Sequence, residues 1–179
     1  CALPIFAHDL ARRGARVTSC DFSPAMLSVA ESRSRKDPGN PMFVRGDATA
    51  LEMPDESFDL VTVGYGLRNL ADMERGLREI ARVLKPGGRV VILDFGKPDN
   101  AAWRAVYFAY LRLAVPAFGR VFAGDWDAYS YILESLRDFP AQRGVDVLLN
   151  RTGFHSTRIW NCLGGVMGIN TGIRDVRLP

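Results

Sequence analysis

Residues 58–95, FDLVTVGYGLRNLADMERGLREIARVLKPGGRVVILDF, contain two apolar runs separated by an amphipathic segment. FDLVTVGYG (58–66) predicts a buried strand, continuously apolar as expected for a strand covered on both faces. Residues 72–88 predict a helix that begins at Asp72 and stops at KPGG, and RVVILDF (89–95) predicts another buried strand. This alternation is typical of an α/β fold with a doubly wound, mostly parallel sheet, in which ligands bind beyond the carboxyl ends of the strands.

The turn GYGLRNL (64–70) ends the first of these strands with two glycines, an arginine and an asparagine. Gly64 and Gly66 allow a close approach to the backbone, while Arg68 and Asn69 bring hydrogen-bond donors to the same point. A plain connection between a strand and a helix needs neither feature. This turn is therefore the first candidate for a functional site.

The rest of the chain extends the pattern in both directions. Before residue 58, hydrophobic period and punctuation predict a helix that closes at Gly14 and another that starts with Ser23 as its N-cap. After residue 95 the segments no longer repeat a strand–helix unit. The expected elements are helices over 5–15, 23–36, 101–122, 125–139 and 144–154, strands over 16–22 and 42–48, and an antiparallel hairpin over 156–174 that turns at two glycines.

Composition limits the class of protein. A chain of 179 residues is long enough for one domain, which we expect to span 1–179. It is 47% apolar and 24% charged and has no run near the roughly 20 apolar residues of a membrane span, so we expect it to be soluble or to sit on a membrane without crossing it. Its three cysteines indicate reduced thiols, so we expect a cytoplasmic protein. A net charge of +3 and dispersed arginines predict no nucleic-acid partner. Three cysteines and two histidines fit neither a disulfide framework nor a metal site, so no metal is expected.

Two more strand ends carry a carboxylate. Asp21 follows VTSC and can accept hydrogen bonds from both hydroxyls of a ribose, although capping of the next helix is the simpler interpretation of this residue alone. Asp47 follows FVRG and can accept from the exocyclic amine of an adenine, while a turn aspartate is the alternative. Together with the glycine turn, the two carboxylates favour an adenosine pocket.

The run from Gly46 to Pro98, with DFSPAML before it and DAYSYILESLRDFP and TGF after it, resembles the C-methyltransferases of ubiquinone and menaquinone biosynthesis. The combination of GLRN, RVLKPGG and DFGKP is highly specific for that family, whereas LKPGG alone marks only the wider superfamily. The resemblance covers nearly the whole chain. It implies an S-adenosylmethionine-dependent enzyme with a Rossmann-like, class I methyltransferase sheet whose last strand is antiparallel.

The resemblance also implies a role for each candidate residue. Asp21 would hold the cofactor ribose, Asp47 and Ala48 would frame the adenine, and the glycine turn would pass beside the methionine portion. The catalytic residues would be Arg68 and Asn69, which face the reaction centre. The cofactor-binding residues would be Asp21, Phe22, Ser23, Met26, Asp47, Ala48, Gly64, Tyr65 and Gly66.

One departure concerns the glycine-rich turn that family members carry between the first strand and the first helix, where backbone N–H groups cradle the methionine end. The corresponding place reads CALPI (1–5) and holds no glycine. Because the downstream motifs are intact, we expect the domain to be N-terminally incomplete and to lack the first strand. A degenerate protein that binds the cofactor poorly is the alternative.

Methyl transfer from a sulfonium is an in-line displacement, so the enzyme mainly aligns donor and acceptor and excludes water. A quinol ring carbon becomes nucleophilic when the hydroxyl beside it is deprotonated, which a base or a cation can assist. Arg68 fits the cation role because a guanidinium stays protonated, although a surface ion pair explains an isolated arginine equally well. Asn69 either orients the substrate or caps the next helix, and the source of the base stays open.

The segment 99–140 is aromatic-rich and helical, and we expect it to form a lid over the acceptor. One side of its first helix carries four residues at helical spacing, namely Trp103, Tyr107, Tyr110 and Leu111. Such a side could guide a polyprenyl tail from a membrane interface. Packing on the sheet or contact between two copies explains the same spacing, so peripheral membrane contact, at the inner face of a membrane, and a homodimer both stay open.

The sequence therefore predicts a methyltransferase that moves a methyl group from S-adenosylmethionine to a ring carbon of a prenylated hydroxyquinol, a demethylmenaquinol or a ubiquinol precursor. A methyltransferase for another small aromatic or polyketide-like acceptor is the alternative among enzymes, because the residues beyond the cofactor motifs are not diagnostic. A non-catalytic scaffold of the same fold is the alternative outside enzymes, because the glycine-rich turn is absent.

Overall fold

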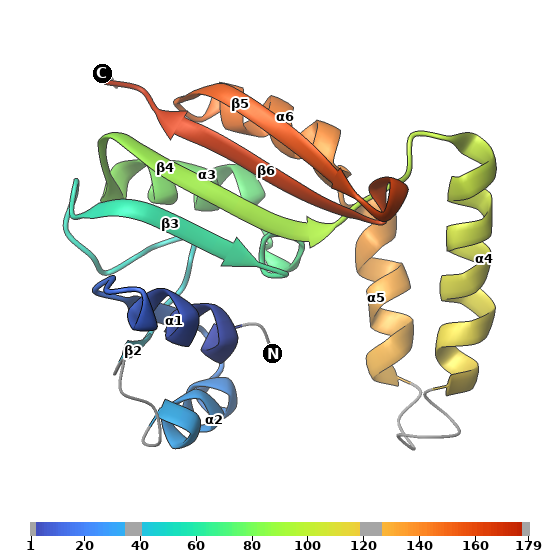
Figure 1. Cartoon of the computed structure of the whole chain (residues 1–179), viewed down its shortest axis with the longest axis horizontal. Coiled ribbons are helices and arrows are strands. Elements are labelled where there is room, and N and C mark those ends of the chain that lie inside the picture. The colour runs from blue at the N-terminus through green and yellow to red at the C-terminus, as the bar shows by residue number, and fades with distance from the viewer. Residues whose placement is uncertain (1–2, 35–40, 119–126, 177–179) are drawn as a thin grey trace.

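The computed structural model describes residues 3–34, 41–118 and 127–176, with side chains over 5–34, 41–113 and 133–176 (Figure 1). Helices and strands alternate over the first half, as predicted. The elements are α1 (Leu3–Arg12), β1 (Thr18–Asp21), α2 (Pro24–Ser34), β2 (Met42–Arg45), β3 (Phe58–Gly64), α3 (Met73–Val83), β4 (Leu84–Phe95), α4 (Ala101–Phe118), α5 (Asp127–Asp138), α6 (Ala141–Arg151), β5 (Phe154–Cys162) and β6 (Met167–Arg174), with short 3-10 turns η1 (Leu67–Asn69) and η3 (Leu163–Gly165).

The described strands form two sheets instead of the single sheet that we predicted. β1 pairs in parallel with β2, and a separate sheet has the order β3-β4-β6-β5. β3 and β4 are parallel, whereas β6 runs antiparallel to both β4 and β5. The expectation of a mostly parallel arrangement was wrong for these residues, because the C-terminal hairpin adds as many antiparallel ladders as there are parallel ones.

The predicted C-terminal hairpin is confirmed. β5 and β6 are joined by η3, where Gly164 has φ +68° and Gly165 has φ +99°, both in the left-handed region that favours glycine. A Cβ on Gly165 would lie 2.9 Å from the Cα of Pro98, so a side chain there would collide with backbone. The turn can therefore pack closely against the segment that leaves β4.

β3 differs from the prediction that it is covered on both faces. Val61 and Val63 pack against the core, but Leu60 is 42% exposed and Thr62 is exposed as well. One edge of β3 pairs with β4, and within the described ranges no strand pairs with its other edge. β3 has the continuous apolar sequence of a central strand, yet it lies at the edge of this sheet.

α3 begins as predicted and packs on the larger sheet. Asp72 is its N-cap, and the carboxylate accepts a hydrogen bond from the N–H of Arg75 at 2.9 Å. Its apolar side joins β4 and α6 in one core, which includes Leu77, Ile80, Ala81, Leu84, Val90, Ile92, Val145 and Leu149. This core fixes the position of the turn between β3 and α3.

The end of α3 differs from the expected stop at KPGG. The helix ends at Val83, and Leu84 is already paired with Phe58 as the first residue of β4. The pairing of β4 with β3 resumes at Arg89, so Lys85–Gly88 form an irregularity within the strand. Leu84 is completely buried, which ties the strand to the core before the glycines.

α4 and α5 pack side by side and project beyond the carboxyl end of β4 at one end of the sheet (Figure 1). The predicted grouping of side chains on α4 was partly wrong. Tyr107 and Leu111 are buried, whereas Trp103 and Tyr110 are about half exposed, because the helix turns one side to α5 and the other outward. Residues 119–126 of the predicted lid, and the side chains of 114–132, lie outside the described part. Among the helices that the structure describes, none is long and apolar enough to cross a membrane.

Candidate functional site

The carboxyl ends of β1 and β2 lie beside each other and carry the two predicted carboxylates. Asp21 is opposite Arg45 in the parallel register, and the N–H of Gly46 donates to the Asp21 carbonyl at 3.2 Å. Burial raises the pKa of the Cys20 thiol, and the charges of Asp21 and Asp47 raise it further. Both carboxylates therefore lie close enough to Cys20 to act on its thiol.

Each carboxylate has one oxygen engaged in a local turn. Oδ1 of Asp21 accepts from the N–H of Ser23 at 2.9 Å, and Oδ1 of Asp47 accepts from the N–H and the hydroxyl of Thr49, both at 2.8 Å. The bonds from Thr49 lower the pKa of Asp47. No residue in the described ranges donates a hydrogen bond to Oδ2 of either carboxylate, so each can still accept from a ligand.

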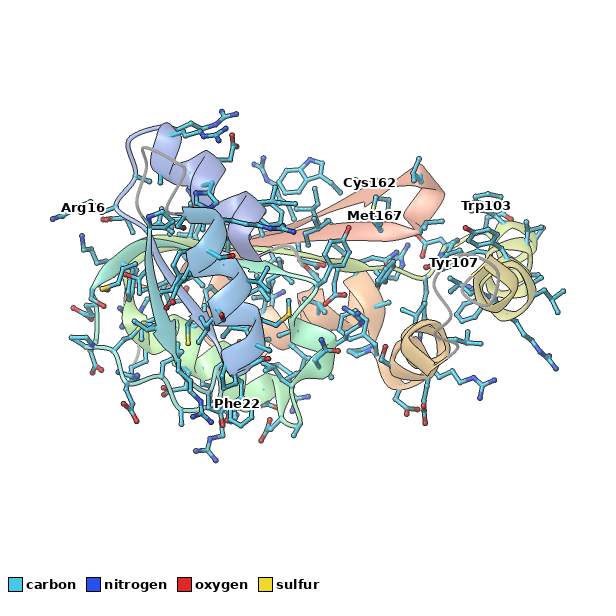
Figure 2. All side chains as sticks on the ribbon, turned by 90° about the horizontal axis from the view of Figure 1, so that it is seen from below. Arg16, Phe22, Trp103, Tyr107, Cys162 and Met167 are labelled. Carbon is cyan, nitrogen blue, oxygen red and sulfur yellow. The ribbon has the colours of Figure 1, made fainter. Side chains whose placement is uncertain are left out.

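The remaining cofactor candidates of this region surround the start of α2. Ser23, and not Asp21, caps the helix, because its hydroxyl accepts from the N–H of Met26 at 3.4 Å. Phe22 is 68% exposed, with the Arg45 guanidinium 5.7 Å from its ring centroid, and Figure 2 shows it pointing away from the body of the molecule. Met26 and Ala48 are half-buried.

The glycine turn contains a strained residue, but it is not a glycine. Tyr65 has φ +55°, while Gly66 has φ −109°, which any residue adopts. The N–H of Tyr65 donates to the carbonyl of Leu93 at 2.8 Å, and its hydroxyl donates to the sulfur of Met167 at 3.2 Å. Its ring lies 5.2 Å from that of Phe95. A residue held in the left-handed region by several contacts is typical of functional bends.

Arg68 points into the molecule, and only 8% of its side chain is exposed. Its Nη1 donates to the Tyr65 carbonyl at 2.7 Å and to Oδ1 of Asp94 at 3.1 Å. Its Nε donates to the hydroxyl of Ser135 on α5 at 3.3 Å, and the guanidinium lies 5.1 Å from the Phe95 ring centroid. The alternative that Arg68 belongs to a surface ion pair was therefore wrong. Nη2 donates to no residue in the part of the chain that the structure describes.

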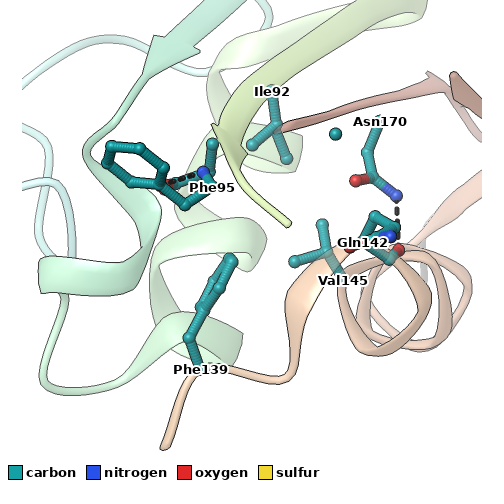
Figure 3. A pocket seen from close by; sticks show the side chains of 8 residues that line it. Ile92, Phe95, Phe139, Gln142, Val145 and Asn170 are labelled. Carbon is teal, nitrogen blue, oxygen red and sulfur yellow. Dashed lines mark hydrogen bonds between the residues drawn. The ribbon is translucent and has the colours of Figure 1, made fainter. Parts of the chain in front are cut away.

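Asp94, the partner of Arg68, lies at the end of β4 in largely apolar surroundings and is 4% exposed. Burial raises its pKa above the ordinary value, and the hydrogen bonds from Phe95 and Arg68 oppose this shift. Figure 3 shows the packed interior beside it, where Phe139 and Val145 approach β4 and the amide of Asn170 donates to the Gln142 carbonyl at 2.8 Å.

A pocket of about 350 Å³ opens beside Arg68 and Asn69. Leu70 and Met73 line it from the segment before and at the start of α3, and α5 supplies the other wall. Asn69 is exposed, and its Nδ2 donates to the Tyr65 carbonyl at 3.3 Å. This wall consists of Glu134, Ser135 and Asp138 of α5, together with Phe139, which follows the helix. The pocket therefore has an apolar floor and polar rims.

The structure brings the candidates together in two groups. Asp21, Phe22, Ser23, Met26, Asp47 and Ala48 surround the ends of β1 and β2, and Gly64, Tyr65, Gly66, Arg68 and Asn69 form the bend after β3. The groups belong to different sheets and are linked through α3, where Nε of Arg75 donates to the Thr49 carbonyl at 2.8 Å.

Sequence reasoning missed two residues of the site, Asp94 and Ser135. A carboxylate directly after the apolar run RVVIL was a usable signal for Asp94, because a buried strand end rarely carries an unpaired charge. No local pattern marks Ser135, which reaches Arg68 only through the packing of α5. Within the described ranges no group of three or more histidine, cysteine or acidic residues could hold a metal.

Comparison with known proteins gives consistent relationships. A family model described as the ubiE/COQ5 methyltransferase family matches residues 3–174. A demethylmenaquinone methyltransferase from Streptomyces griseus is 43% identical over 168 residues, which cover 94% of this chain and 71% of that protein. A mitochondrial 2-methoxy-6-polyprenyl-1,4-benzoquinol methylase from Danio rerio is 38% identical over 162 residues, which cover 89% of this chain and 49% of that protein.

A solved structure supports the fold. An S-adenosylmethionine-dependent methyltransferase from Methanosarcina mazei superposes with a TM-score of 0.65 at 17% identity, covering 94% of this chain and 86% of that one. At this identity the likeness shows an α/β fold of the methyltransferase type and nothing finer.

Proposed function

Because the chain belongs to the ubiE/COQ5 methyltransferase family, we propose that it methylates a ring carbon of a prenylated hydroxyquinol. The chain is an S-adenosylmethionine-dependent methyltransferase. The proposed acceptor class rests on the names of its relatives, a demethylmenaquinone methyltransferase and a polyprenyl-benzoquinol methylase. Both acceptors are quinones or quinols with a hydrophobic tail.

The residues around β1 and β2 fit the proposed cofactor. S-adenosylmethionine supplies a methyl group on a positively charged sulfur. Oδ2 of Asp21 would accept from the ribose hydroxyls, and the turn of Asp47 and Ala48 would frame the adenine. Gly66 fits a close approach, because a Cβ there would meet only Val63 at 3.5 Å within the protein. The chain itself thus has no steric need for this glycine, which supports the passage of a ligand beside Gly64, Tyr65 and Gly66.

The pocket beside the bend supports a site for the acceptor ring. Arg68 and Asn69 line it, and Nη2 of Arg68 carries donors that no described residue uses. A guanidinium near the ring hydroxyl would favour its phenolate and raise the electron density on the neighbouring carbon. Asn69 would orient the ring. α5 forms one wall, which supports a lid role for the segment 99–140.

The separation of the strands into two sheets supports the prediction of a class I methyltransferase sheet that lacks its first strand. In a single doubly wound sheet of the class I type, a further parallel strand would lie between β1 and β3 and pair with both. β3 has the sequence of a central strand and an edge without a described partner, and both features fit such an addition. A glycine-rich turn after that strand would complete the cofactor site.

The outer face of α4 is suited to the surface of a bilayer. It consists of Val106, Tyr110 and Leu113, which are spaced three or four residues apart and are between 52% and 70% exposed. Trp103 lies at its edge, where the indole N–H donates to the Leu163 carbonyl at 3.2 Å. Tryptophan and tyrosine favour the boundary between lipid and water. A prenylated acceptor resides in the membrane, so contact there would bring the pocket to its substrate.

The test uses the full gene product, S-adenosylmethionine with an isotope-labelled methyl group, and a short-chain prenylated hydroxynaphthoquinol. We expect labelled product in which carbon–carbon coupling in the NMR spectrum places the methyl on the ring. Asp21→Asn should weaken S-adenosylhomocysteine binding in calorimetry by roughly 10- to 100-fold, the cost of a charged hydrogen bond. Asp99→Asn is the matched control, because Asp99 pairs with Arg143 at the surface.

Different results would favour the two alternatives. Binding of S-adenosylhomocysteine without transfer to any quinol, but with transfer to another phenol, would favour a different aromatic acceptor. A folded full gene product that does not bind S-adenosylhomocysteine would contradict the enzyme and favour a scaffold.

A further inference from the structure

The bend after β3 depends on a buried ion pair behind it. Asp94 receives hydrogen bonds from the N–H of Phe95 at 2.9 Å, from Nη1 of Arg68 at 3.1 Å and from the N–H of Arg68 at 3.3 Å. The side chains of Asp94 and Arg68 are 4% and 8% exposed. At this burial each charge needs the other, because water cannot replace the missing partner.

The same Arg68 nitrogen that binds Asp94 also binds the strained residue. Nη1 donates to the Tyr65 carbonyl at 2.7 Å while it donates to Oδ1 of Asp94. A guanidinium is a planar fork, so holding it at Asp94 also fixes where its N–H groups point. The Ser135 hydroxyl accepts from Nε of the same guanidinium, and the Phe95 ring packs against its face.

The Tyr65 conformation needs this support. A tyrosine at φ +55° is in a region that non-glycine residues rarely adopt, and it persists where the surroundings over-determine it. Its carbonyl accepts from both Arg68 and Asn69, which are two of the residues that line the acceptor pocket. The geometry of the pocket rim and that of the strained bend are therefore set by one hydrogen-bonded group.

We propose that Asp94 is a positioning residue for the methyl transfer. It does not touch either substrate, but it orients Arg68, which holds the Tyr65 bend between the cofactor and acceptor sites and aims Nη2 at the acceptor. This proposal rests on the proposed function, because it assigns that bend to the reaction centre. It differs from a purely structural ion pair in that loss of Asp94 changes the chemical step more than substrate binding.

The experiment is a double-mutant cycle in the full gene product with Asp94→Asn, Arg68→Met and the double variant, measuring kcat and both KM values. Asp94→Asn should lower kcat roughly 10- to 100-fold while KM for S-adenosylmethionine changes less than about threefold, since misplaced reacting groups cost rate. In the Arg68→Met background the same change should cost less than about threefold, because Asp94 acts through Arg68. Independent, multiplying losses would overturn the proposal.

Two controls separate positioning from folding. Asp59→Asn breaks another aspartate ion pair, a surface pair with Lys85 at 2.8 Å, and should leave kcat unchanged. If Asp94→Asn does not fold, Arg68→Lys keeps a cation beside Asp94 but has neither the Nε that bonds Ser135 nor the Nη2 that is aimed at the acceptor. Arg68→Lys should then lose kcat to a similar extent, and an enzyme with wild-type kcat would overturn the proposal.

A structural readout keeps this test apart from the proposed function. Crystals of Asp94→Asn should show the Arg68 guanidinium rotated from the Tyr65 carbonyl and a changed φ at Tyr65. An unchanged bend would overturn the proposal whatever the acceptor is. Failure of the wild-type protein to methylate any quinol, with the bend altered in the variant, would instead overturn only the proposed acceptor.

Discussion

At the level of single residues, the bend after β3 places a left-handed conformation and a missing side chain on two different residues, whereas one glycine usually provides both. The left-handed conformation falls on Tyr65, which is held there by hydrogen bonds and ring contacts, while Gly66 has an ordinary φ of −109°. A side chain at position 66 would meet no backbone. The absence of a side chain at Gly66 is therefore better explained by a ligand than by the fold.

Substitution of Gly66 by alanine tests this explanation. Gly66→Ala should change the free energy of unfolding by less than about 1 kcal/mol, because it fits an allowed conformation. The same change should weaken S-adenosylhomocysteine binding in calorimetry. Gly96→Ala is the contrasting control: its Cβ would lie 2.4 Å from the Gly165 carbonyl oxygen, and overpacking should cost about 1–3 kcal/mol in urea unfolding. Wild-type affinity in Gly66→Ala would contradict the cofactor assignment.

The hydroxyl of Tyr107 is a buried polar group with unusual surroundings. It is buried without a hydrogen-bond partner in the described chain, and burial raises the pKa of Tyr107 to about 12. Tyr107→Phe removes the unsatisfied hydroxyl, so it should leave the free energy of unfolding unchanged or raise it by about 1 kcal/mol. Thermal denaturation measures this directly. A loss of stability would mean that the hydroxyl has a partner, such as a bound water.

Among the elements, α3 does more than cover the sheet, because it holds the loop that follows Asp47. Oε2 of Glu79 accepts from the N–H of Leu51 at 2.8 Å, and Arg82 donates to the carbonyls of Leu51 at 2.7 Å and Met53 at 2.9 Å. Glu79 and Arg82 also pair with each other at 2.8 Å. One helix therefore supports both groups of candidate site residues.

The hydrogen bond from Arg82, together with the one from Leu51, lowers the pKa of Glu79 below its ordinary value of 4.5, although burial opposes this shift. Because the pKa of Glu79 is lower in the folded state, its ionised carboxylate stabilises the fold fully above pH 4.5. This stabilisation is lost as the pH falls through the pKa of the folded state. Glu79→Gln should lower the free energy of unfolding by about 1–2 kcal/mol at pH 7. The difference in the free energy of unfolding between this variant and wild type, measured by urea unfolding, should become smaller below pH 4.5. Glu74→Gln, in a more exposed pair with Arg78, should have a smaller effect, and a gap that persists in acid would contradict this account.

At the scale of the whole molecule, the proposed cofactor residues of β1 and β2 and the proposed membrane surface of α4 lie at different ends. The strand ends with Asp21 and Asp47 belong to the half that contains β1, β2 and α2, while α4 and α5 form the opposite end (Figure 1). α4 thus lies away from the strand ends that carry Asp21 and Asp47 (Figure 1). A surface placed there can meet a membrane without obstructing the cofactor.

A vesicle flotation assay tests the outer face of α4. The double variant Val106→Gln/Leu113→Gln should fold normally, since these side chains are 56% and 70% exposed, but should bind phosphatidylcholine–phosphatidylglycerol vesicles less well than wild type. The matched control is Ile5→Gln/Val147→Gln, which are 66% and 56% exposed on other helices. Equal flotation of all three proteins would contradict membrane contact. Loss of self-association in the first variant, measured by sedimentation, would instead identify a dimer face.

Local chemistry, which depends on neighbouring residues in the chain, could be predicted from the sequence. The N-caps Ser23 and Asp72, the hairpin at Gly164 and Gly165, and the carboxylates at adjacent strand ends all follow from short patterns, because caps and turns involve atoms only a few residues apart. The membership of the methyltransferase family is likewise carried by short motifs.

The tertiary structure alone decided which distant residues meet. No pattern in the sequence indicates that Asp94 neutralises Arg68, that Ser135 reaches Arg68 from α5, or that the left-handed residue is Tyr65. β3 has the sequence of a central strand, and among the described residues only β4 pairs with it. The physical reason is that strand partners and buried charge pairs depend on where separate elements pack, and local propensity carries no record of that arrangement.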